Sequence, residues 1–132
     1  MKRFQLLIPV FLMIGLAGAL AFAQVDFSKE HNGLLRHVVC FSFKDDAAPA
    51  DIQKVVDAFA DLPNKIPSIV SFECGTNVSP EGLTKGFTHC FVLTFKTAKD
   101  RDAYLPHPDH KAFGKVLGPV MKDVFVIDYW TK

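Results

Sequence analysis

Large apolar residues recur at every second position in four stretches of the chain, and this spacing predicts β-strands. The stretches cover residues 37–43, about 69–76, 84–95 and 124–130. After Pro49, and again after Pro108, apolar residues recur at helical spacing, as expected of helices that bury one side. Thr97 and Asp100 resemble a capping box, which predicts a short helix that ends at Tyr104.

The predicted order of elements is β-α-β-β-α-α-β, which is close to the split βαβ plan of a ferredoxin-like domain. We therefore expect an α+β fold in which a four-stranded antiparallel sheet carries its helices on one face. A chain of 132 residues has room for one such domain and its core.

The phases of the strands divide the predicted sheet into two faces. One face carries bulky residues that we expect beneath the helices: His37, Val39, Phe41 and Phe43, then His89, Phe91, Leu93 and Phe95, then Phe125, Ile127 and Tyr129. The other face carries smaller residues, such as Val38 and Val92, that are hardly polar. Because an antiparallel sheet open to water normally shows charges there, we expect a homodimer that buries this face.

The N-terminal residues follow a different pattern. Lys2 and Arg3 precede an apolar run that closes on Ala21-Phe22-Ala23, the layout of a secretory signal peptide cleaved before Gln24. The alternative is an uncleaved anchor, because twenty mostly apolar residues could span a bilayer of about 30 Å. We expect a signal peptide at 1–23, a flexible leader at 24–33 and the folded domain at 34–132. The protein would then be exported, periplasmic or secreted, without a membrane segment after cleavage.

Charge and cysteine content narrow the classes of partner. The formal net charge is +1, and it falls close to zero without the signal peptide, so nucleic acid is not an expected partner. The three cysteines, Cys40, Cys74 and Cys90, fit no metal-binding spacing. We interpret them as small buried hydrophobes, with a Cys40–Cys90 bridge or a bridge between subunits as the alternatives.

Candidate chemistry gathers in the second half of the chain. His89 lies in an apolar strand, where an imidazole needs a polar partner. Tyr104, His107 and His110 follow around two prolines, and His37 is predicted on the same face as His89. A histidine and a tyrosine can act as an acid–base pair, but the same groups could also form a network that only fixes the packing. We expect neither a metal nor a cofactor, since no set of ligands with metal-binding spacing accompanies the histidines.

Three segments carry a resemblance to a known family: RHVVCFSFKDDA, the strand that contains GFTH, and the segment that begins YLPHPDH. From about Leu35 to Tyr129 the chain resembles the stress-responsive A/B barrel (Dabb) family. The resemblance implies a ferredoxin-like domain that forms a dimeric α/β barrel. One plant member of this family is a polyketide cyclase that uses a His and a Tyr. By that resemblance, the catalytic pair here would be His110 and Tyr104, with His37 and His89 as further pocket histidines.

The sequence leaves three functional hypotheses open. The first is an exported Dabb-type domain that binds a small hydrophobic or aromatic molecule, with ligand contacts from His37, His89, Phe91 and His107. The second is a cyclase-like lyase or isomerase in which His110 is the general base and Tyr104 orients a carbonyl group. The third is a non-enzymatic stress-tolerance or structural protein.

Overall fold

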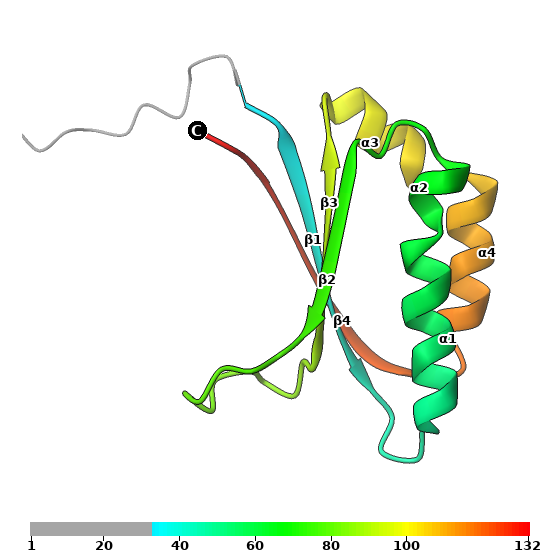
Figure 1. The fold of residues 1–132 in the computed structure, drawn as a ribbon, viewed down its shortest axis with the longest axis vertical. Helices are drawn as coiled ribbons and strands as arrows, with labels where there is room; N and C mark the ends of the chain where they lie inside the picture. The colour runs from blue at the N-terminus through cyan, green and yellow to red at the C-terminus, as the bar shows by residue number, and fades with distance from the viewer. Residues whose placement is uncertain (1–32) are drawn as a thin grey trace, which may run out of the picture.

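In the computed structural model, residues 33–132 form a four-stranded sheet with helices packed against one side (Figure 1). Along this described part the elements are β1 Leu35–Phe43, α1 Pro49–Ala60, α2 Leu62–Lys65, β2 Ser71–Thr76, β3 His89–Phe95, α3 Ala98–Tyr104, α4 Pro108–Leu117 and β4 Met121–Trp130. The predicted signal peptide lies outside the described residues, as does all but the last residue of the predicted leader. None of the described helices has the length and apolar run needed to cross a bilayer.

The strands lie in the order β2-β3-β1-β4, and every neighbouring pair is antiparallel. β1 and β3 are therefore central, while β2 and β4 form the two edges of the sheet. This arrangement confirms the predicted α+β, ferredoxin-like fold with helices on one face (Figure 1).

Local sequence signals explain where the helices begin. α1 starts at Pro49, where the missing N–H costs nothing, and α3 starts after Thr97, whose hydroxyl accepts from the Asp100 N–H at 3.1 Å. The sequence pattern does not predict the short helix α2, because a proline is typical of the end of a helix. Pro63 instead stands in the first turn of α2, a position that tolerates proline.

The third strand is shorter than its apolar pattern suggests. The predicted strand began at residue 84, whereas β3 begins at His89. Lys85 and Gly86 have φ angles of 53° and 87°, in the left-handed region, so the backbone turns there and cannot join the ladder.

Phenylalanines from the sheet and the helices form the centre of the core. The ring of Phe59 in α1 lies 4.6 Å from Phe91 and 4.5 Å from Phe113, measured between centroids. Phe41 lies 5.3 Å from Phe91, and all four rings are at least 95% buried. These contacts join two helices to both central strands, and each aromatic pair adds about 0.5–1.5 kcal/mol beyond the burial of its area.

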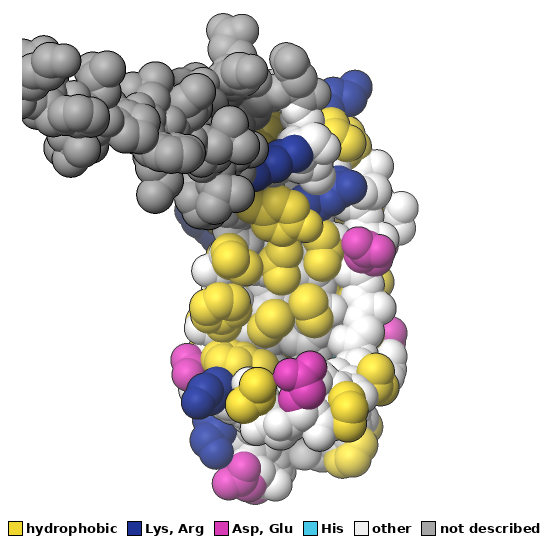
Figure 2. Space-filling view, turned by 90° about the vertical axis from the view of Figure 1, so that its left-hand side faces the viewer, with side chains coloured by type: hydrophobic (Ala, Val, Ile, Leu, Met, Phe, Trp, Pro, Cys, Tyr) yellow, Lys and Arg dark blue, Asp and Glu magenta, His cyan; other side chains and the backbone are white. Residues whose placement is uncertain are grey.

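The face of the sheet opposite the helices, here called the open face, carries the bulky row of β4. Phe125, Ile127 and Tyr129 are 46–49% exposed, and Ile127 pairs with Val38 of the open face. Figure 2 shows the apolar side chains that gather on this face. The prediction that this row lies beneath the helices is therefore wrong. The alternate β4 residues face the helices, among them Asp128, which pairs with the buried His37.

Candidate ligand-binding and acid–base site

A cavity of about 530 Å³ lies between the β1–β4 side of the sheet and helices α3 and α4. Apolar side chains such as Val39, Phe113 and Val126 form much of its wall. Six polar or charged residues also line it: His37, Arg101, Tyr104, His110, Lys111 and Asp128. The volume falls in the range of small-molecule sites, which are mainly apolar with a few placed polar groups.

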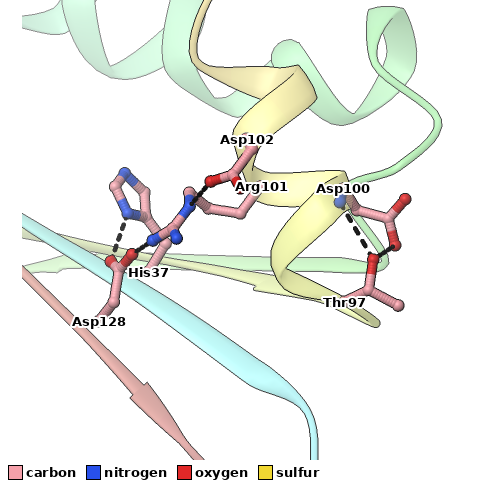
Figure 3. Close-up of polar contacts among 6 residues, drawn as sticks. All are labelled: His37, Thr97, Asp100, Arg101, Asp102 and Asp128. Carbon is pink, nitrogen blue, oxygen red and sulfur yellow. Dashed lines mark hydrogen bonds and ion pairs between the residues drawn. The ribbon is translucent and has the colours of Figure 1, made fainter.

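His37, Asp128 and Arg101 form a connected polar group at this cavity (Figure 3). His37 Nδ1 lies 2.6 Å from Asp128 Oδ1, and Arg101 forms an ion pair with the other carboxylate oxygen. The contact arises because β1 and β4 place His37 and Asp128 directly opposite each other. Arg101 comes from α3 and also pairs with Asp102 at 2.8 Å. The carboxylate therefore fixes the imidazole, and the guanidinium fixes the carboxylate.

The protonation state of His37 follows from its surroundings. Burial, helped by the positive charges of Arg101 and His110, lowers the pKa of His37 from 6.5 to about 4. The imidazole is consequently neutral at pH 7. Since a carboxylate can only accept, Nδ1–H donates to Asp128 and Nε2 keeps its lone pair. Figure 3 shows this second ring nitrogen pointing away from Asp128, so it is the basic atom of the group.

Tyr104, the last residue of α3, contributes a buried phenol. The residue is 0% exposed, and its hydroxyl has no hydrogen-bond partner among residues 33–132. Its ring lies 4.3 Å from the His110 ring and 5.8 Å from the His37 ring. Burial raises the pKa of Tyr104 above its ordinary value of 10, so the phenol stays protonated and can only donate to an incoming anion or carbonyl.

His110 lies in the first turn of α4 and is partly exposed. Its Nδ1 is 2.9 Å from the carbonyl oxygen of Leu105, which accepts the Nδ1–H bond. Because the carbonyl oxygen can only accept, this bond holds a proton on Nδ1, and Nε2 is the nitrogen left to take part in proton transfer next to the Tyr104 ring. The structure thus brings together three of the predicted site residues: Tyr104, His110 and His37.

The other predicted site residues lie elsewhere. His89 pairs with Phe41, four positions from His37 along β1 and therefore about 13 Å away, so its expected position beside Tyr104 is corrected. Phe91 is 1% exposed and belongs to the phenylalanine core. His107 caps α4, and its Nδ1 accepts from the Asp109 N–H at 3.2 Å. These three do not line the cavity that contains Tyr104. Their role as ligand contacts stays a prediction.

Sequence reasoning missed Arg101 and Asp128. One signal for Asp128 was present, because a single carboxylate in the apolar stretch 124–130 needs a polar partner if it faces the core. Arg101 gave no comparable signal, since it stands among other charged residues of a short helix. Among the described residues, no three His, Cys, Asp or Glu side chains gather in a way that could hold a metal ion.

Comparison with known proteins defines the class of this protein. The family model for the stress-responsive A/B barrel domain matches residues 35–131, and the chain belongs to this family. Among its relatives is the stress-response A/B barrel domain-containing protein HS1 of Arabidopsis thaliana, 36% identical over 101 residues, which cover 76% of this chain and 93% of the relative. Olivetolic acid cyclase of Cannabis sativa is 26% identical over 95 residues, 72% of this chain and 94% of the relative.

A solved structure from Bacteroides fragilis is similar in fold and is a dimer. It matches with a TM-score of 0.63 and 27% identity, covering 77% of this chain and 100% of that chain. That relative is described as a dimeric protein of unknown function with a ferredoxin-like fold. Dimer formation is therefore found among proteins that share this fold and are related in sequence.

Proposed function

We propose that this Dabb domain binds a small hydrophobic or aromatic molecule in the cavity beside Tyr104, and that a carbonyl-type oxygen of that molecule accepts from the Tyr104 hydroxyl. The observation that carries the proposal is the buried hydroxyl without a partner in the described chain. A buried donor without an acceptor costs about 1–3 kcal/mol, and a bound oxygen would remove that cost. The apolar wall would take the rest of the molecule.

Binding of hydroxylated alkyl phenyl ketones tests this proposal. Calorimetric titration of the purified protein should show a Tyr104→Phe variant that binds roughly tenfold more weakly, as expected for one lost hydrogen bond. Tyr129→Phe is the matched control, because Tyr129 lies on the open face and should leave the affinity unchanged. Equal affinities for both variants, or a cavity that takes up no member of the series, would contradict the proposal.

A second candidate function is acid–base catalysis on such a ligand. It is favoured by two imidazoles and a protonated phenol at one mainly apolar cavity, and by the relationship to olivetolic acid cyclase. In this hypothesis Nε2 of His110 removes a proton next to a carbonyl group, and Tyr104 donates to the carbonyl oxygen as it gains charge. His37, held by Asp128, would supply a second base.

Deuterium exchange tests this candidate without knowledge of the natural substrate. The protein should accelerate exchange of the protons between the carbonyls of an apolar β-diketone, followed by NMR. His110→Ala and Tyr104→Phe should abolish the acceleration while the melting temperature stays nearly constant. His107→Ala is the control, since His107 caps α4 outside the cavity. If both site variants unfold the protein, the network is structural, which favours the third hypothesis of a non-enzymatic stress-tolerance protein.

We further propose that two protomers pair through the open face. Phe125, Ile127 and Tyr129 are nearly half exposed there, and the Bacteroides fragilis relative is a dimer. Light scattering after size exclusion should give a dimer for the natural chain and a monomer for Ile127→Lys. A dimer for this variant, or a larger ring for the natural chain, would contradict pairing by this face alone.

Export also remains a proposal, supported by the N-terminal pattern of the sequence. Expression of the full chain in a host with a secretion pathway, followed by N-terminal sequencing, should give a mature protein that begins at Gln24. An intact N-terminus would contradict cleavage.

A further inference from the structure

The cavity beside Tyr104 has a polar end and an apolar end. The register of β1 and β4 places His37 opposite Asp128 at the polar end. Further along the same two strands it places Phe41 opposite Val124, and both of these apolar side chains line the cavity. Asp128 and Val124 are four residues apart in one strand, so the two ends are separated by about 13 Å. A ligand that fills the cavity therefore has a polar head and an apolar tail.

Two valines of β4 form an apolar floor that the helices leave uncovered. Val124 and Val126 are 41% and 49% exposed, although they line the cavity on the helix-covered side of the sheet. Val39 of β1 pairs with Val126 and lines the same cavity, but it is only 5% exposed. The cavity therefore opens to solvent as a cleft between β4 and α4. Pairing of two protomers through the open face would not cover this cleft, because the cleft lies on the other side of the sheet.

Gly114 of α4 borders this cleft without a local need for glycine. A Cβ atom built there would meet no atom within 4 Å outside its own stretch of helix, whereas one at Gly118 would come 3.3 Å from the Gly114 carbonyl oxygen. The backbone of Gly114 does not have the positive φ that favours glycine. Glycine inside a helix is also less stable than alanine. The structural consequence of the missing side chain is open space in the wall of the cavity.

His110 connects this open space to the polar end of the cavity. His110 and Gly114 are four residues apart in α4, so they lie on the same side of the helix. Both line the cavity, and the His110 ring lies 4.3 Å from the Tyr104 ring. A molecule that is bound at Tyr104 and continues along α4 therefore passes Gly114 before it reaches Leu117, which lines the cavity further along the helix.

We propose that Gly114 is a specificity-determining residue, which leaves the cleft wide enough for the unbranched apolar tail of a ligand whose carbonyl oxygen binds Tyr104. The tail lies between Gly114 on α4 and the two valines of β4, and it removes their exposed surface from water. This role of Gly114 rests on the proposed function, because the tail belongs to the same ligand. The class of ligand is then an elongated ketone with one polar end.

A series of alkyl phenyl ketones with unbranched chains that lengthen from methyl to heptyl tests the role of Gly114. In calorimetric titrations of the natural protein, the affinity should rise by roughly threefold to fourfold for each added methylene that reaches the valines. Gly114→Leu fills the open space, so its affinity should stay level along the series, while the methyl ketone binds as it does to the natural protein. Lys115→Leu is the matched control and should keep the rise, because Lys115 is exposed and does not line the cavity.

Gly114→Ala provides a second readout, which decides the question if Gly114→Leu unfolds the domain. Alanine favours the helix, so Gly114→Ala should melt at a higher temperature and still bind the longest ketone more weakly than the natural protein. The role of Gly114 is overturned if affinity does not depend on chain length, or if the Gly114 variants keep the rise of the natural protein. In either case short ketones that bind through Tyr104 leave the proposed function standing. If no ketone binds at all, the proposed function fails, and the role of Gly114 fails with it.

Discussion

The two ends of the helix-covered face carry one histidine each, and the two residues have different surroundings. His37 contacts a carboxylate at 2.6 Å and lies beside two further aromatic polar rings, those of Tyr104 and His110. His89 packs edge-on against Phe43 at 5.1 Å, and its Nδ1 shares a hydrogen bond of 2.9 Å with the Thr88 hydroxyl. Burial lowers the pKa of both imidazoles, but only His37 has an ionised partner that orients it.

This difference shows that the position of a histidine on a sheet face does not define its chemistry. The groups on the neighbouring strand and on the helix above decide whether a buried imidazole becomes an oriented base. At the His37 end, β4 supplies Asp128 and α3 supplies Arg101 and Tyr104. At the His89 end, the neighbouring core side chains are phenylalanines.

Removal of the Asp128 carboxylate should have the largest effect on the difference between the His37 end and the His89 end. Asp128→Ala leaves the Nδ1–H of His37 without its partner and takes one carboxylate from Arg101, which keeps its contact with Asp102, in a mostly buried setting. We expect the free energy of unfolding to fall by about 3 kcal/mol, measured by urea denaturation. Asp123→Ala in the same strand is the control and should change it by less than about 0.5 kcal/mol, because Asp123 is exposed. Similar losses for both variants would contradict the role given to Asp128.

The pH dependence of stability should show the next largest difference between His37 and His89. The pKa of His37 is about 4 in the folded protein and near 6.5 when unfolded, so the unfolded chain binds the extra proton first. The contribution of neutral His37 to the free energy of unfolding is complete above pH 6.5 and is lost as the pH falls towards 4, by about 3 kcal/mol. His37→Gln should flatten the curve in that window more than His89→Gln. If both variants flatten the pH–stability curve equally, the difference between the His37 end and the His89 end of the sheet is contradicted.

Tyr104→Phe should have a smaller effect on folding than either change. The variant keeps the ring contacts with His110 and Phe95 and removes only a hydroxyl without a partner in the described structure. We expect the free energy of unfolding to stay within about 1 kcal/mol of the natural protein, or to rise. A larger loss, seen by calorimetry, would mean that the hydroxyl already has a stabilising partner.

The smallest expected effect concerns His89 and the ligand. His89 lies about 13 Å along the sheet from His37, so His89→Gln should leave the affinity for phenyl ketones unchanged within error. Titration followed by NMR should shift the ring signals of His37 and His110 but not those of His89. A shift at His89 would restore its predicted role as a ligand contact.

Alternation predicted most of the fold, because β1 and β3 carry bulky, buried residues on one side and smaller, less buried residues on the other. The phase of β4 could not be predicted in the same way. Val124 and Val126 alternate with Phe125 and Ile127, so both sides are apolar and a period of two gives no contrast. Asp128 alone decides the phase, and only the pairing with His37 reveals why it points inward.

The candidate site was predictable where its residues are close in the sequence. Tyr104 and His110 are separated by one tight connection, so their contact follows from local chain geometry. The contacts of His37 with Asp128 and of Asp128 with Arg101 join residues 91 and 27 positions apart, respectively. Such contacts depend on strand order and register, which local patterns do not contain.

One strand therefore serves two surfaces at once. In β4, odd-numbered Phe125, Ile127 and Tyr129 face outward, while even-numbered Val126 and Asp128 face the cavity. If β4 slipped by one residue, its outward apolar row and its inward Asp128 would exchange sides, and both surfaces would be lost together. An interaction that stabilises the outward row should therefore also stabilise Asp128, which orients the His37 ring. If two protomers pair through this row, as proposed above, dilution to single protomers should loosen the His37 ring before the domain unfolds.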